Sequence, residues 1–80
     1  AVALGMHPAR LIVYEKCSHP ELKKRLYQFA REHRYVTGFV HCLGNWDYEL
    51  NLEVPEPREI AVLTEELLVK FRSSIRAVAD

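Results

Sequence analysis

The stretch HCLGNWDYELNLEV, His41 to Val54, decides the fold of this chain. Two runs in which apolar and polar residues alternate flank the dipeptide Gly44-Asn45. Alternation with a period of two indicates β-strands, and both turn residues tolerate the positive φ that a tight hairpin turn requires. The sequence therefore predicts a β-hairpin with strands Val36–Leu43 and Trp46–Val54.

A two-residue turn also fixes which residues lie opposite each other, and the expected pairs separate into two faces. One face is aliphatic and aromatic and pairs Leu43 with Trp46, His41 with Tyr48, Phe39 with Leu50 and Thr37 with Leu52. The other is mixed and acidic and pairs Cys42 with Asp47, Val40 with Glu49, Gly38 with Asn51 and Val36 with Glu53. A shift of one residue would mix the two sets, so we expect this register.

The segment Ala9–Lys16, ARLIVYEK, predicts another strand because it is short and rich in branched and aromatic residues. Ile12 and Tyr14 lie on one of its faces and Leu11 and Val13 on the other, so both faces are apolar. This pattern is typical of a central strand that is covered on two sides.

Two amphipathic helices are predicted between and after these strands. The first runs from about His19 to His33, opens with the capping box Ser18-x-x-Glu21, and has an apolar stripe of Leu22, Leu26, Phe29, Ala30 and His33. The second follows Pro55 and Pro57, and its inner stripe holds Ile60, Leu63, Leu67, Phe71 and, as an option, Ile75. The tail from Ser73 to Asp80 predicts a helix exit and a last strand that is cut short.

The order strand, helix, strand, strand, helix, strand predicts a single ferredoxin-like α+β domain over residues 1–80. In this fold two helices cover one face of an antiparallel sheet, and we expect them on the face of Trp46, Tyr48 and Leu50. The opposite face stays open, and an open apolar face indicates a partner. We expect a homodimer through that face, with either Leu11 and Val13 or Ile12 and Tyr14 joining Val36, Val40 and Cys42. The first pair is our choice for the interface.

Composition excludes several classes of function. The 80 residues carry eleven basic and eleven acidic side chains, so there is no net charge that would attract nucleic acid. The one basic cluster, Lys23 to Arg25, is interpreted as the solvated face of a helix. No apolar run approaches the length of a membrane span, so we expect a cytoplasmic protein with no membrane contact.

The residues that could carry chemistry do not form a catalytic or metal-binding pattern. Cys17 and Cys42 are expected to be free thiols, because their strands are separated by a third strand and their spacing does not suit zinc. His41 and Cys42 are adjacent in a strand and point to opposite faces, so they cannot act as base and nucleophile. His41 is expected to lie under the helices with a hydrogen-bond partner. We expect no metal, no cofactor and no enzymatic activity.

The hairpin is the predicted recognition site. Asp47 is the first residue of an acidic row that continues with Glu49, Asn51 and Glu53 on the face without helices. Carboxylates there could bind an ammonium or guanidinium group. The alternative is that these carboxylates form a solvated face that hinders self-association. Trp46 is expected to be a core aromatic residue or the wall of a pocket beside the turn.

Three segments resemble the leucine-responsive/asparagine-operon regulator (Lrp/AsnC) family. LGNWDYELNLEV, residues 43–54, resembles the Gly-x-x-Asp hairpin of the family's C-terminal effector-binding and oligomerisation domain. LGMHPARLIVYEK, residues 4–16, is similar to the first strand of that domain and to the glycine before it. LLVKFRSSIRAV, residues 67–78, is similar to its second helix and the entry to its last strand. The three segments lie between residues 4 and 78 and so are spread over nearly the whole length of the chain.

The resemblance implies a domain that dimerises through its sheet, forms larger rings and binds an amino acid or related metabolite between subunits. It places the effector near Gly44, Asn45, Trp46 and Asp47. It also implies DNA binding only through an N-terminal winged helix-turn-helix that is missing from this chain. Two alternatives remain open: a small enzyme of the dimeric α+β barrel type that uses His41 or Asp47, and a stand-alone amino-acid-sensing module.

Overall fold

The computed structural model describes residues 5–16, 20–42 and 47–79, and of Asp47 it describes the backbone only. Its elements follow in the order β1 (His7–Glu15), α1 (Pro20–Glu32), β2 (Val36–His41), β3 (Asp47–Val54), α2 (Arg58–Lys70) and β4 (Ile75–Ala79). The predicted strand–helix–strand–strand–helix–strand order is confirmed. The bounds differ from the predicted ones by one or two residues at most ends.

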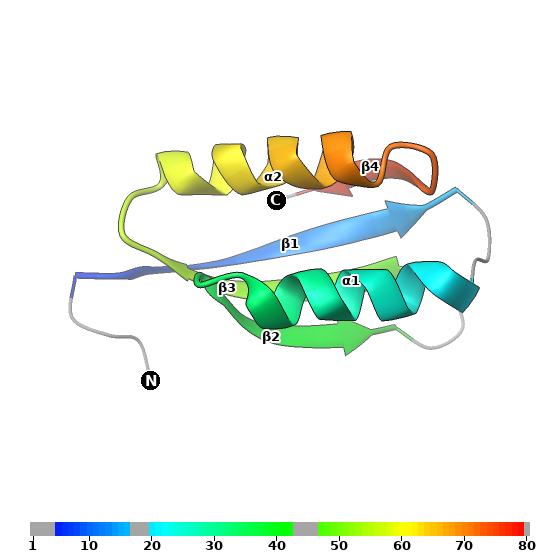
Figure 1. Cartoon of the computed structure of the whole chain (residues 1–80). Coiled ribbons are helices and arrows are strands. Elements are labelled where there is room, and N and C mark those ends of the chain that lie inside the picture. Colours follow the sequence, from blue (N-terminus) through cyan, green and yellow to red (C-terminus); the bar gives the residue numbers. More distant parts are fainter. Residues whose placement is uncertain (1–4, 17–19, 43–46, 80) are drawn as a thin grey trace.

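The strands form one antiparallel sheet in the order β2-β3-β1-β4, and both helices lie on the same face of it (Figure 1). Helix α1 packs beside β2, and α2 packs beside β4. The first and third strands therefore lie at the centre of the sheet, and β2 and β4 are its edges. The ferredoxin-like α+β fold class is therefore confirmed as well.

The hairpin register is confirmed at four of the eight predicted pairs. The pair of Leu43 with Trp46 lies outside the described residues, and the pair of Cys42 with Asp47 stays a prediction. Gly38 pairs with Asn51, Phe39 with Leu50, Val40 with Glu49 and His41 with Tyr48. Toward the start of β2 the register shifts, so that Val36 pairs with Leu52 and the predicted pairs of Thr37 with Leu52 and Val36 with Glu53 are wrong. A β-bulge at this edge strand accounts for the shift, because it places an extra residue opposite the same partner.

The core lies between the helices and one face of the sheet. The buried strand residues include Tyr48, Leu50, Leu52 and Val54 of β3, and α1 and α2 contribute Leu22, Leu26, Phe29, Leu63 and Leu67. These helical residues are the stripes that the sequence predicted. Phe71 and Ile75 are also buried, but Ile75 belongs to β4 and not to the second helix.

Three of the five residues assigned to the dimer interface lie on the helix-covered face. Leu11 and Val13 pair with Leu50 and Tyr48, and both are fully buried within the chain itself. Because side chains alternate along a strand, Ile12 and Tyr14 lie on the open face instead. The assignment of Val36 to the interface is also wrong, because the bulge pairs Val36 with Leu52 and packs it against the core.

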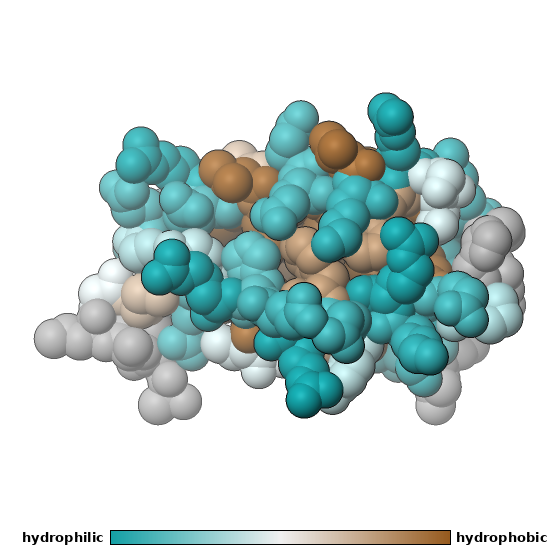
Figure 2. Space-filling view, in the orientation of Figure 1, coloured by the Kyte–Doolittle hydropathy of each residue, from teal (hydrophilic) through white to brown (hydrophobic). Residues whose placement is uncertain are grey.

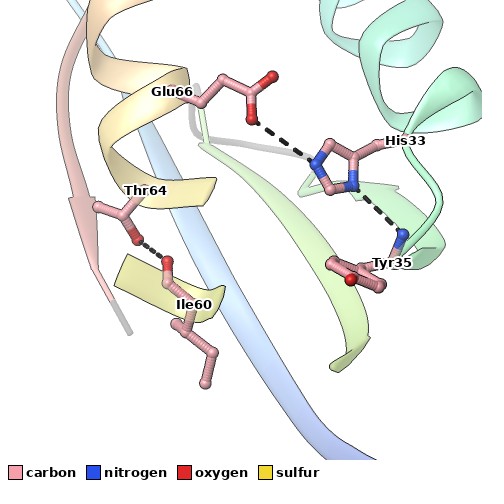
Figure 3. A network of polar contacts seen from close by, with 5 residues as sticks. All are labelled: His33, Tyr35, Ile60, Thr64 and Glu66. Carbon is pink, nitrogen blue, oxygen red and sulfur yellow. Dashed lines mark hydrogen bonds and ion pairs between the residues drawn. The ribbon is translucent and has the colours of Figure 1, made fainter. Parts of the chain in front are cut away.

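His33 connects the end of α1 to Tyr35, the residue before β2, and to Glu66 of α2 (Figure 3). The backbone N–H of Tyr35 donates to His33 Nδ1 at 3.2 Å, and His33 Nε2 lies 3.7 Å from Glu66 Oε1 on α2. Since Nδ1 accepts a hydrogen bond, the neutral ring carries its proton on Nε2, toward the carboxylate. The ring also lies against Phe29 and Tyr35, with centroid separations of 5.5 and 5.7 Å.

Candidate functional site

The hairpin end of the sheet is where the sequence placed the effector site. Gly44, Asn45 and Trp46 lie outside the described residues, and so does the side chain of Asp47. The backbone of Asp47 pairs with Tyr14 of β1, so the start of β3 is anchored in the middle of the sheet. The assignment of the effector to these four residues remains a prediction.

Tyr48 is the innermost aromatic residue of this end of the sheet. It is 2% exposed, and its hydroxyl forms a hydrogen bond with Glu15, the last residue of β1, which is 4% exposed. Burial, the negative charge of Glu15 and this hydrogen bond together raise the pKa of Tyr48 from its ordinary value of 10 to about 12. The phenol therefore stays protonated and donates the hydrogen bond to the Glu15 carboxylate.

His41 stacks on Tyr48 from the neighbouring strand. Their ring centroids are 4.7 Å apart with an angle of 17° between the planes. The Nε2 atom of His41 is buried and has no hydrogen-bond partner among the described residues, contrary to the partnered state that we expected. The histidine is held by ring contact, and a buried ring nitrogen without a partner costs free energy.

Beside this stack, α1 and β2 enclose an open groove of about 540 Å³. Phe39 continues the row of rings, because it lies 5.7 Å from Tyr48 and 5.8 Å from Tyr27 of α1. Among the described residues, the side chains that line the groove are Pro20, Lys23, Lys24, Tyr27, Phe39 and His41. The groove thus combines an aromatic wall with two exposed ammonium groups.

The open face of the sheet has a different character. Its β3 residues are Glu49, Asn51 and Glu53, as the register predicted, and Arg10 of β1 lies 3.9 Å from the Glu49 carboxylate. Val40, opposite Glu49, is 46% exposed, whereas Cys42 is half-buried. Ile12, Tyr14, Ala77 and Ala79 add further half-buried apolar surface. This face therefore presents apolar residues around an acidic row.

The sequence interpretation missed part of the hairpin end. Lys23 and Lys24 were assigned to a solvated helix face, and neither Tyr27 nor Phe39 was placed beside them. Glu15 was also missed, although it follows Leu11 and Val13 in the alternation of β1 and could have been placed on their buried face. No local signal predicts the lysine–aromatic grouping, because it depends on how α1 packs against β2.

Neither a metal site nor a membrane span is visible in the described parts of the chain. Residues 5–16, 20–42 and 47–79 contain no group of three His, Cys, Asp or Glu side chains that could hold a metal ion. Within the same ranges, no helix is long and apolar enough to cross a membrane. Cys42 is a free thiol, and Cys17 lies outside the described residues.

The chain shares its fold with a transcription regulator. No family model matches the sequence, and no curated protein matches it. Among solved structures, it is similar to an AsnC family transcriptional regulator from Agrobacterium tumefaciens, with a TM-score of 0.71 and 23% sequence identity. The match covers 95% of this chain and 49% of the regulator, so this chain spans about half of that protein's length. The fold expected from the Lrp/AsnC resemblance is confirmed.

Proposed function

We propose that the chain is the ligand-sensing and oligomerisation domain of an Lrp/AsnC-type transcription regulator. The shared fold and the similarity of the hairpin sequence support the class. The observation that carries the proposal is the open sheet face, because both helices lie on the other side and apolar side chains remain accessible. DNA binding belongs to a separate winged helix-turn-helix domain in this proposal.

In the proposed dimer, two copies pack through their open sheet faces. The corrected interface consists of Val40 and Cys42 with Ile12 and Tyr14, flanked by Ala77 and Ala79. Burying apolar surface is the main driving force of such an association. Arg10 lies beside the acidic row and could pair with a carboxylate of the other copy as well as with Glu49.

The dimer can be tested with a charge placed on the open face. Val40→Lys should keep the fold, since Val40 is 46% exposed and a lysine there would face Glu49 across the strands. It should shift the chain from dimer to monomer in sedimentation equilibrium, because an ammonium group would have to be desolvated in the interface. The measurement is the dissociation constant of the dimer.

Val69→Lys is the matched control, because Val69 is 61% exposed on the outer surface of α2, away from the open face. Figure 2 shows apolar side chains in the upper part of the view, where Figure 1 draws α2. This control should leave the dimer intact. A native chain that sediments as a monomer at micromolar concentration, or equal dissociation of both variants, would contradict the proposed interface.

The effector site at Gly44 to Asp47 is the second part of the proposal. The ligand is an amino acid or related metabolite held between subunits, with the Asp47 carboxylate pairing with its ammonium group. A thermal-shift screen against the amino acids tests this assignment. A ligand at 100 times its dissociation constant raises the free energy of unfolding by about 2.7 kcal/mol. Asp47→Ala should abolish the stabilisation by the ligand. An unchanged shift and an unchanged oligomer size would contradict this assignment.

The alternative of a small enzyme requires an acid and a base aimed into one cavity. In the described part of the chain, His41 Nε2 is buried without a partner and its ring is stacked on Tyr48. The described residues therefore offer no acid–base pair around His41, and the regulatory domain is the better supported function.

A further inference from the structure

The groove between α1 and β2 is built from residues that come close only through folding. Pro20, Lys23, Lys24 and Tyr27 recur at three- and four-residue spacing and so lie on one side of α1. Phe39 and His41 are two residues apart in β2 and so lie on the same, helix-covered face of the sheet. Its volume of about 540 Å³ falls within the range of small-molecule sites.

The wall of the groove offers a surface for a planar ring. Tyr27 and Phe39 meet edge to face at 70°, whereas Phe39 and His41 both stack nearly parallel on Tyr48, at 23° and 17°. Tyr27 is 52% exposed although it contacts this row, so its ring is accessible from the groove. Aromatic pairs with these offset and edge geometries stabilise more than their buried area alone predicts.

The charge of the groove comes from Lys23 and Lys24. Both are exposed, and neither forms an ion pair with another residue in the described ranges. Two adjacent ammonium groups at the edge of an apolar wall suit a ligand with one anionic end. A carboxylate fits this requirement because it can accept hydrogen bonds from both groups.

A second hollow shows that volume alone does not make this combination. It has about 520 Å³ and lies along the start of α2, where its lining residues are Pro57, Ile60, Ala61, Thr64 and Glu65. These described lining residues include no aromatic ring and no basic side chain. The grouping of rings and lysines in the α1–β2 groove therefore does not follow from its volume.

We propose that the α1–β2 groove binds a small molecule that carries an aromatic ring and a carboxylate. The ring packs against Tyr27 and Phe39, and the carboxylate pairs with Lys23 and Lys24. The lining residues that the structure describes all belong to one chain, so the site can be tested without the dimer.

Phenylacetate is the probe for this site, with backbone amide chemical shifts of the 80-residue chain as the measurement. Saturable shifts should map to residues 20–27 and 39–41. Acetate, which has the charge without the ring, and benzylamine, which has the ring with the opposite charge, should bind at least about tenfold more weakly. Saturable binding of benzylamine with equal affinity would overturn the proposal, as would phenylacetate shifts that map to α2 or to the open sheet face.

Two variants separate the roles of charge and ring. Lys23→Gln with Lys24→Gln should weaken phenylacetate binding roughly tenfold or more, because both ammonium groups are lost. The matched control is Lys16→Gln with Arg72→Gln, which removes the same charge at exposed positions outside the groove and should leave binding unchanged. Tyr27→Leu should also weaken binding while the exposed site keeps the fold intact. Equal weakening in the control pair, or full binding in both groove variants, would overturn the assignment.

Discussion

Tyr48 is the residue at which the core meets the hairpin end. Its ring is enclosed by Phe39 and His41, and its hydroxyl reaches Glu15 on the adjacent strand. A buried carboxylate costs free energy unless it is hydrogen-bonded, so the hydrogen bond from the Tyr48 hydroxyl stabilises the buried Glu15. This pair fixes the end of β1 against the start of β3, next to the predicted effector site.

The raised pKa of Tyr48 predicts a loss of stability at alkaline pH. Between pH 10 and pH 12 the folded chain retains a proton that the unfolded chain releases, so the unfolding free energy falls as pH rises through this window. The contribution, on the order of 2 kcal/mol, is fully present below pH 10. Denaturant unfolding at several pH values should show this loss in the native chain.

Tyr48→Phe is the comparison for this measurement, because it keeps the ring and removes the titrating group. The other tyrosines remain in both proteins, so their titration cancels in the difference. The variant should be less stable than the native chain below pH 10, and the difference should shrink toward pH 12. Parallel pH curves for the two proteins would show that Tyr48 titrates normally in the folded state.

At the scale of the elements, β2 is an edge strand that is joined to the sheet through β3 alone, and its register shifts near Thr37. The Thr37 hydroxyl donates to the Asn51 carbonyl at 3.2 Å, and the Glu53 N–H donates to the Tyr35 carbonyl at 2.9 Å. These bonds hold the bulged end of the strand next to the His33 connection.

His33→Ala tests how far that connection stabilises the start of β2. The substitution removes the acceptor of the Tyr35 N–H and the ring contacts with Phe29, and we expect a loss of about 1 to 2 kcal/mol in urea unfolding. Glu66→Gln is the control, and it should cost less than about 0.5 kcal/mol because Glu66 is half exposed. A larger loss for the control would mean that the ion pair, and not the backbone hydrogen bond, carries the connection.

At the scale of the whole molecule, the chain has one well-formed core and one uncovered sheet face. A domain of this length buries only about 60% of its unfolded surface, so its stability is sensitive to further burial. The proposed dimer would cover the open face and add apolar contacts around Ile12 and Val40. Folding and association would then be coupled in one equilibrium.

That coupling predicts a melting temperature that depends on concentration. Because only folded chains associate, dimerisation stabilises the folded state. The melting temperature of the native chain should therefore rise as the protein concentration is raised from low to high micromolar. Val40→Lys should melt at one temperature across the same series, and Val69→Lys should follow the native chain. A native melting temperature that is independent of concentration would count against a dimer of folded subunits.

The sequence alone determined the hairpin and the apolar stripes of the helices. The pairing of Gly38 to His41 with Tyr48 to Asn51 could be predicted, because a period of two sorts each side chain to one face and only one register keeps the sorted faces together. The buried stripe of α1 could be predicted for the same reason, with a period of 3.6.

The tertiary structure decided which face of β1 is covered, because both of its faces are apolar and alternation cannot choose between them. It also decided that a bulge packs Val36 inward, that Glu15 reaches Tyr48, and that Lys23 and Lys24 flank Phe39 and His41. A local pattern records which residues share a face. Which element covers that face depends on contacts between segments that are distant in the chain, and only the folded structure contains them.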